Sequence, residues 1–199
     1  YFQSGMYKHA LIVGVETLSR IVDWKDRSVC VLFADGAGAA VVTADETTGL
    51  LASSMGSDGI HSQALIVKNR ENNNPFDPGE RPMDHLYMDG PAVFKFAVKT
   101  VPKSIENTLA KADLTPADVD LYILHQANMR INQVISKKLN VPMDKFPSNM
   151  DHCGNTSGAS VPLLLDEVCK KGMIHSGDTI VMAGFGAGLT WGTVVLTWA

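Results

Sequence analysis

The 199-residue sequence contains no run of eighteen apolar residues, so we expect no segment that crosses a bilayer as a helix. Its net charge of −4 gives no overall reason to expect nucleic acid or an anionic membrane as a partner. Cysteine is scarce: Cys30, Cys153 and Cys169 are odd in number and show no C-x-x-C spacing. These absences argue against a disulfide framework and favour a reducing, cytoplasmic compartment.

Closely spaced histidines are also missing. Two histidines four residues apart on a helix would suggest a metal site, and no such pair occurs among His9, His61, His85, His152 and His175. We therefore predict no metal site. The composition that is present, 45% apolar and 19% charged, is that of an ordinary globular protein with enough chain to bury a substantial core.

Strand-like and helix-like segments alternate along the chain. Short apolar or β-branched runs predict strands at 10–16, 28–34, 38–44, 49–55 and 118–125, with two more within 178–198. Apolar residues at spacings of three and four predict helices at 91–113, 128–140 and 160–172. Pro102 should kink or split the first of these helices. The alternation predicts an α/β fold with a layered sheet.

One pattern occurs twice. "ALIVGVE" followed by "DGAGAAVVTA" is similar to "TIVMAGF" followed by "GAGLTWGTVVLTW": an apolar strand, a glycine-rich segment and a valine-rich strand. An internal duplication would explain the repeat, and so would chance similarity between segments rich in glycine and valine.

Three short stretches contain residues that could act on a ligand. His125 ends a predicted central strand, at the sheet edge where α/β proteins bind ligands, although a packed or capping histidine is the commoner case. Asn155 lies in a small-residue loop before a helix, where its amide could donate to a ligand oxygen or simply cap a turn. The glycines of 183–192 could expose backbone N–H groups as an oxyanion site or form a tight turn.

A cationic helix face is the remaining candidate. Arg130, Lys137 and Lys138 are seven and eight residues apart and share one side of the predicted helix. This face suggests an acidic partner, and an ordinary solvated helix face is the alternative.

Taken together, the motifs resemble one known family. "HQANMR", "GNTSGASVP" and "AGFGAGLTWG", in this order and preceded by "DRSVCVLFADGAGAAVV" and "MDGPAVFKFAVKTV", resemble β-ketoacyl-acyl-carrier-protein synthase III, the condensing enzyme that initiates bacterial fatty acid synthesis. The resemblance runs from Met6 to Trp198 and implies a thiolase-like layered α/β fold in truncated form. We expect a protease-tag remnant at 1–5, the end of the first thiolase-like half at 6–47 and the complete second half at 48–199.

The resemblance also implies a Cys-His-Asn catalytic set, in which His125 and Asn155 match the last two members. The family's cysteine would precede Met6, and none of Cys30, Cys153 and Cys169 stands at the matching place, so we expect this fragment to be inactive alone. The backbone of Ala187 would contribute to the oxyanion site. The implied substrate-binding positions are Arg27, Met88, Gly90, Phe94, Ala127, Asn128 and Phe185. The implied carrier-protein-binding positions are Lys95, Arg130, Lys137 and Lys138.

The activity implied for the full-length protein is acyl transfer by decarboxylative Claisen condensation of acyl-coenzyme A with malonyl-carrier protein. Coenzyme A thioester enters as substrate, no separate cofactor is expected, and the full-length protein is expected to be a homodimer. Three alternatives stay open: a polyketide-type or alkylquinolone-type condensing enzyme, a non-catalytic coenzyme A or carrier-protein binding module, and a fragment that self-associates through an exposed sheet edge.

Overall fold

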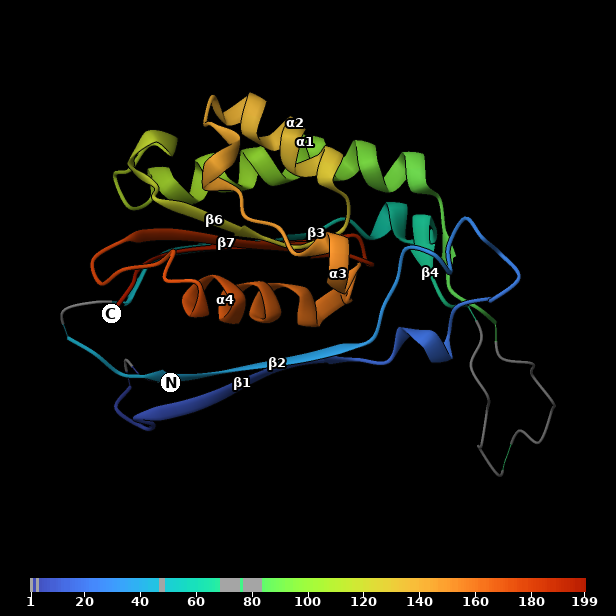
Figure 1. Cartoon of the computed structure of the whole chain (residues 1–199), viewed down its shortest axis with the longest axis horizontal. Coiled ribbons are helices and arrows are strands. Elements are labelled where there is room, and N and C mark those ends of the chain that lie inside the picture. Colours follow the sequence, from blue (N-terminus) through green and yellow to red (C-terminus); the bar gives the residue numbers. More distant parts are fainter. Residues whose placement is uncertain (1, 3, 47–48, 69–75, 77–83) are drawn as a thin grey trace.

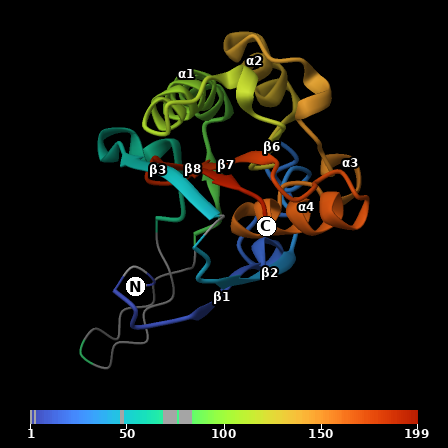
Figure 2. The same cartoon turned by 90° about the vertical axis from the view of Figure 1, so that its left-hand side faces the viewer.

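A computed structural model of the chain describes residue 2, residues 4–46, 49–68, residue 76 and residues 84–199. Residues 1 and 3 of the expected tag remnant lie outside the described part. The described elements stack in layers: two helices, a four-stranded sheet, a single helix, and a two-stranded sheet (Figures 1 and 2). This arrangement agrees with the layered α/β fold that the alternating pattern predicts.

The four-stranded sheet is mixed and has the order β3-β8-β7-β6. Its strands are β3 (Gly49–Ser57), β6 (Leu121–Leu124), β7 (Thr179–Gly186) and β8 (Thr190–Thr197). β6 and β7 are parallel, whereas β7 pairs with β8 and β8 with β3 in antiparallel register. Every residue of β6 is buried, as expected for a parallel strand covered on both faces.

Helices cover both faces of this sheet. α1 (Gly90–Ala110) and α2 (Met129–Leu139) lie on one face, and α4 (Ser160–Lys170) lies on the other (Figure 1). The short α3 (Met150–Cys153) precedes α4. The 3₁₀ helices are Leu18–Arg20, Gly59–Ala64, Pro116–Asp118, Met143–Lys145 and Ser157–Ala159. No helix in the described ranges is both long and apolar enough to span a membrane.

A second, two-stranded sheet lies on the far side of α4 (Figure 2). Its strands, β1 (His9–Glu16) and β2 (Gly36–Thr43), are antiparallel, and a further short pair joins β4 (Leu65–Ile66) to β5 (Tyr87–Met88). Several large apolar side chains of the β1–β2 sheet are exposed, including Leu11, Val13 and Val41. Self-association through this sheet stays a prediction.

Two hydrophobic clusters hold the layers together. Between α1, α2 and the sheet, the fully buried Ile105, Tyr122 and Ile135 belong to one cluster. On the opposite face, Ile123 and Leu164 belong to the other, so successive residues of β6 point into different clusters. β6 is therefore anchored from both sides just before His125, the residue that follows it.

The structure corrects one predicted strand. Residues 28–34 form turns, with a single bridge at Phe33. The carboxylate of Asp26 accepts hydrogen bonds from the backbone N–H and the hydroxyl of Ser28, and the Asp26 carbonyl accepts from Cys30 N at 2.9 Å. An Asx-type turn of this kind competes with extended backbone. The pattern of apolar residues alone does not indicate the turn.

Pro102 does not split α1, which is one helix from Gly90 to Ala110. A proline has no N–H, so the carbonyl of Val98, four residues earlier, loses its helical partner. Lys138 Nζ on α2 donates to that carbonyl at 2.9 Å. The lysine therefore satisfies the group that Pro102 leaves free and ties α2 to α1.

The repeated sequence pattern has a structural counterpart. β1–β2 and β7–β8 are both antiparallel ladders of eight-residue strands, and α4 lies between the two sheets that contain them. The shared arrangement favours an internal duplication over chance similarity.

Candidate functional site

A cavity of about 820 Å³ opens where β6 and β7 end. Both candidate donors, His125 and Asn155, line it, and so does the glycine-rich end of β7 with Ala187. Six of the seven implied substrate-binding residues also line it: Met88, Gly90, Phe94, Ala127, Asn128 and Phe185. Residues spread over a hundred positions of sequence are thus brought together at one place.

His125 is held by the sheet and by an aromatic ring. Its backbone N–H donates to Ala183 O at 2.8 Å, which continues the β6–β7 pairing by one residue. The ring lies edge-on to Phe185, with 5.1 Å between centroids and an interplanar angle of 78°. The side chain is half-buried and faces the cavity rather than the core.

Ser160, the first residue of α4, contacts one nitrogen of the imidazole. Its Oγ lies 2.5 Å from His125 Nδ1 and accepts from the Gln126 backbone N–H at 3.4 Å. Nδ1 is thus engaged with the Ser160 hydroxyl. Nε2 is the ring nitrogen that is left to contact a ligand in the cavity.

Burial keeps this histidine neutral. Desolvation by the surrounding side chains lowers the pKa of His125 to about 4, because a charged imidazolium is poorly stabilised there. At neutral pH the ring is an uncharged hydrogen-bond donor, not an acid.

Asn155 is oriented by its own loop. Its backbone exchanges hydrogen bonds with residues 32–34, donating to Leu32 O at 3.1 Å and accepting from Ala34 N at 2.8 Å. Its Oδ1 accepts from Ser157 N at 2.9 Å. With the oxygen engaged in this turn, the amide nitrogen Nδ2 is the part of the side chain available to donate to a ligand.

The β1–β2 sheet presses against the same loop. The Gly158 N–H donates to Glu16 Oε1 at 3.3 Å. A Cβ at Gly14 would lie 2.5 Å from the Gly158 carbonyl oxygen, so β1 can approach the loop only with glycine at that position. The loop carrying Asn155 is consequently packed closely against β1.

Helix starts form another part of the wall. Asp89 Oδ1 caps α1 by accepting from Ala92 N at 3.0 Å, and Asn128 Oδ1 caps α2 by accepting from Arg130 N at 2.9 Å. Asn128 thus combines a place in the cavity wall with a structural role in starting α2.

None of the three cysteines lines this cavity. Cys153 lies instead beside His152 and Glu167, and burial raises the pKa of its thiol. An activated nucleophile requires the opposite shift. The surroundings of Cys153 thus do not favour a nucleophilic thiolate.

The remaining implied residues lie outside the cavity. Arg27 is exposed in the turns before β2. Lys95 on α1 and Arg130, Lys137 and Lys138 on α2 are exposed on the helical layer. Lys138 has the structural contact to Val98 described above, so its ammonium group is partly committed to holding α2 in place.

Sequence reasoning missed several parts of the site. Ser160 carries no signal of its own, since its role depends on a contact with a residue thirty-five positions earlier. The apolar wall formed by Leu18, Leu32, Phe33 and Trp191 was also missed, because such residues are indistinguishable from core residues in a sequence. Together they make an apolar cavity with two neutral N–H donors, which is suited to stabilising a developing negative charge on a carbonyl oxygen.

Helices on both faces of a mixed sheet, a further sheet beyond α4 and this pair of donors define the class as thiolase-like. The model for 3-oxoacyl-[acyl-carrier-protein (ACP)] synthase III matches residues 1–59, and the model for the C-terminal part of the same family matches residues 109–198. The chain belongs to the 3-oxoacyl-[acyl-carrier-protein] synthase III family.

Individual relatives agree. The chain is 44% identical over 199 residues to the β-ketoacyl-[acyl-carrier-protein] synthase III of Clostridium acetobutylicum, matching 100% of itself and 61% of that relative. The crystal structure of 3-oxoacyl-[acyl-carrier-protein] synthase III from Aquifex aeolicus superposes with a TM-score of 0.89 at 40% identity, covering 99% of this chain and 60% of that one. The priming β-ketosynthase of the R1128 polyketide pathway superposes with a TM-score of 0.88 at 36% identity, covering 98% and 58%.

The chain therefore spans 61% of the length of its curated Clostridium acetobutylicum relative. Both that alignment and the first family match include residues 1–5, which the sequence analysis set apart as a tag remnant. The boundary between the two halves at 47/48 stays a prediction.

Proposed function

We propose that the protein acts in the decarboxylative condensation of an acyl thioester with malonyl-carrier protein, the step that initiates fatty acid synthesis. The observation that carries the proposal is the presence of His125 and Asn155 in the wall of one apolar cavity. Each has one polar atom engaged by a neighbour: Ser160 contacts the histidine Nδ1, and the Ser157 backbone N–H donates to the asparagine Oδ1. We assign the histidine proton to Nε2, and Nε2–H and the asparagine amide nitrogen are then the atoms that donate to a ligand.

The two donors serve the decarboxylation. When the malonyl thioester loses carbon dioxide, the electrons of the broken C–C bond form an enolate whose charge rests on the thioester oxygen. The Nε2–H of His125 and the Nδ2–H of Asn155 donate to that oxygen. Because both donors are neutral, they stabilise the enolate without protonating it, and in an apolar site this interaction is strong.

The condensation needs a cysteine as well. By resemblance to the family, an upstream cysteine carries the acyl group as a thioester. The enolate carbon attacks its carbonyl to form the new C–C bond and a tetrahedral oxyanion, which then collapses and expels the cysteine thiolate. The backbone N–H of Ala187 and that of the cysteine would hold the intermediate oxyanion. Met88, Phe94 and Asn128 line the cavity, and by resemblance they would contact the pantetheine arm. By the same resemblance, Arg27 would lie near the adenine end.

A chimera tests the proposed function. The part of the Clostridium acetobutylicum relative that precedes its matched region is joined to this chain at the aligned position. We expect the chimera to take up labelled acetyl from acetyl-coenzyme A and to convert malonyl-carrier protein into a β-ketoacyl product, measured by radiolabelling and mass spectrometry. This chain alone should take up no acetyl label, because no cysteine lines its cavity.

Two outcomes would count against this reading. Stoichiometric acetylation of Cys153 in the chain alone would place the nucleophile within the chain. A folded, acetylated chimera that neither decarboxylates malonyl-carrier protein nor condenses would remove the role given to His125 and Asn155.

The carrier protein should bind the exposed cationic face of α2. Carrier proteins are acidic, and Arg130 and Lys137 are exposed on one helix face. We expect the R130E/K137E double variant to weaken binding of malonyl-carrier protein about tenfold, with a smaller difference at high salt. Lys138 is left intact because it supports the Val98 carbonyl. Titration calorimetry at two salt concentrations measures the effect.

A matched control carries the same charge change elsewhere. Lys8 precedes β1 and Lys170 ends α4, on the opposite side of the sheet from α2. The K8E/K170E variant should bind the carrier protein as the parent does. Equal weakening by both double variants would show that net charge, and not the α2 face, governs binding.

A non-catalytic coenzyme A or carrier-protein binding module is the second candidate, because the apolar cavity and the cationic α2 face would serve binding alone. A chimera that binds both ligands without any turnover would support this module. The similarity to a priming β-ketosynthase of a polyketide pathway leaves the product class to be identified by mass spectrometry. We also propose that the full-length protein is a homodimer, on the resemblance to the family, and that it is cytoplasmic, because the cysteines are free.

A further inference from the structure

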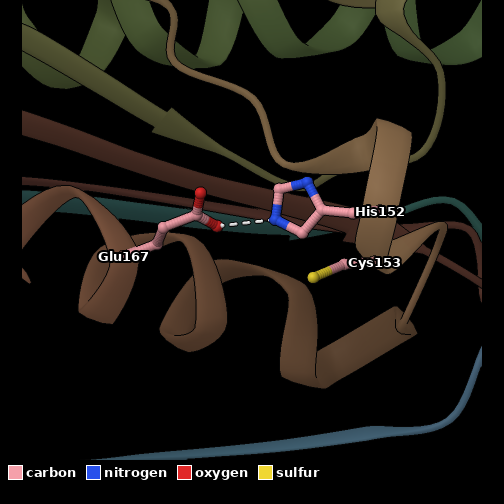
Figure 3. Close-up of side chains that lie close together, drawn as sticks. All are labelled: His152, Cys153 and Glu167. Atoms are coloured by element: carbon pink, nitrogen blue, oxygen red, sulfur yellow. Dashed lines mark hydrogen bonds and ion pairs between the residues drawn. The ribbon is translucent and has the colours of Figure 1, made fainter. Parts of the chain in front are cut away.

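Three metal-binding side chains of different chemical types meet at the junction of α3 and α4. His152 and Cys153 come from α3, and Glu167 comes from α4. Their nitrogen, sulfur and oxygen ligand atoms all lie within 4.8 Å of one another, and the three side chains converge in Figure 3. None of the three lines the cavity that contains His125.

A neighbouring carboxylate orients His152. Asp151 Oδ1 lies 2.8 Å from Nδ1, and Nε2 faces Glu167 Oε2 at 3.2 Å. Metal-bound histidines usually hold their second ring nitrogen in such a hydrogen bond, which fixes the ring and makes the ligating nitrogen more basic. Nε2 is therefore the nitrogen presented to the cluster.

Glu167 is oriented in the same way. Lys171 Nζ donates to Oε1 at 2.6 Å, which leaves Oε2 directed at His152. The side chain of Glu167 is 22% exposed, whereas that of His152 is 54% exposed. The cluster thus has a partly buried base and an open side.

From this geometry we propose that His152, Cys153 and Glu167 bind one Zn²⁺ ion, with water in the fourth position on the open side. Tetrahedral zinc, with bonds of about 2.0–2.3 Å, needs its ligand atoms about 3.4–3.6 Å apart. The 3.2 Å separation of Nε2 and Oε2 is already close to that spacing. A thiolate and an imidazole in one set select zinc over magnesium or calcium.

The ion would join two segments that matter for the first site. α3 leads directly into Gly154 and Asn155, and α4 begins with Ser160. Zinc at this place clamps the start of the Asn155 loop to α4. The spacing of histidines along the sequence does not indicate this set of ligands, because only one of the three is a histidine and the third comes from the next helix.

Titration of the reduced full chain with Zn²⁺ tests the site. We expect one equivalent of Zn²⁺ to bind. The dissociation constant should rise at least about tenfold in Cys153→Ser and in Glu167→Gln. The second variant keeps the test valid if the first one misfolds. Co²⁺ replaces zinc for spectroscopy: a thiolate-to-cobalt charge-transfer band should appear with the parent chain and with Glu167→Gln at saturation, and be absent with Cys153→Ser.

The double variant Cys169→Ser/His175→Asn removes a comparable pair of exposed ligands elsewhere. It should bind Zn²⁺ as tightly as the parent. The proposal is overturned if this control loses as much affinity as Cys153→Ser, or if the parent chain binds no saturable equivalent of zinc. Neither result depends on acyl transfer, so the zinc site stands or falls independently of the proposed function.

Discussion

Replacing His125 by alanine should lower the rate of malonyl-carrier-protein decarboxylation by the chimera about 10²–10³-fold, the usual cost of removing one preorganised donor from an oxyanion site. In the proposed step, the only task of the imidazole is to donate a hydrogen bond from Nε2 to the enolate oxygen. The loss should appear in kcat and much less in KM, because the enolate charge exists only beyond the ground state.

Asn155→Ala should give a loss of similar size for the same reason. Combining both substitutions should cost less than the product of the two separate losses, since one donor cannot align the enolate oxygen alone. Decarboxylation is followed by release of labelled carbon dioxide, which separates this step from acetyl transfer to the cysteine. Acetyl transfer should persist in both single variants.

The pH dependence gives a second signature of His125. Because desolvation lowers its pKa to about 4, the imidazole stays neutral throughout the neutral range. The decarboxylation rate should therefore show no ionisation step of this residue between about pH 5.5 and 8. Ser160→Ala removes the hydroxyl that contacts Nδ1, so it should reduce kcat by loosening the orientation of the ring while leaving the protein folded.

A contrary result is easy to recognise. If His125→Ala decarboxylates at the parental rate while its unfolding curve is unchanged, the histidine is a packed residue against Phe185 and Ser160. The commoner role of a histidine at the end of a strand would then be the right one.

Periodic patterns predicted most of the fold because they record burial along single elements. The apolar run at 118–125 and the three-and-four spacing at 128–140 correspond to β6 and α2. The prediction of a strand at 28–34 was wrong because the carboxylate of Asp26 accepts a hydrogen bond that favours turns. An apolar pattern carries no information about such a competing hydrogen bond.

Some residues of the candidate site were predictable from the sequence, and others were not. His125 and Asn155 were found because each sits at a recognisable element boundary, within stretches that resemble a known family. Ser160 and the pairing of Lys138 with the Val98 carbonyl were not, because each depends on two elements meeting in space. Pro102 was recognised as a helix breaker, but the cation that compensates for it lies thirty-six residues further on.

The strand that ends at His125 should depend heavily on Tyr122. This side chain is fully buried on β6, and its ring stacks on Phe146 with 4.5 Å between centroids and 8° between planes. Its hydroxyl donates to Pro116 O at 2.8 Å. The side chain thus joins β6 to two neighbouring segments, the 3₁₀ helix Pro116–Asp118 and the residue that follows the 3₁₀ helix Met143–Lys145.

Tyr122→Ala should lower the free energy of unfolding by about 3–5 kcal/mol, because it removes a large buried ring and leaves a cavity that β6, pinned on both faces, cannot close. Tyr122→Phe keeps the stacking and loses one hydrogen bond, so about 1 kcal/mol is expected. Tyr87→Ala, at an exposed tyrosine, should stay within about 0.5 kcal/mol of the parent. Urea unfolding followed by circular dichroism measures all three. If Tyr122→Phe cost as much as Tyr122→Ala, the hydroxyl contact with Pro116, and not the packing against Phe146, would be what anchors the strand.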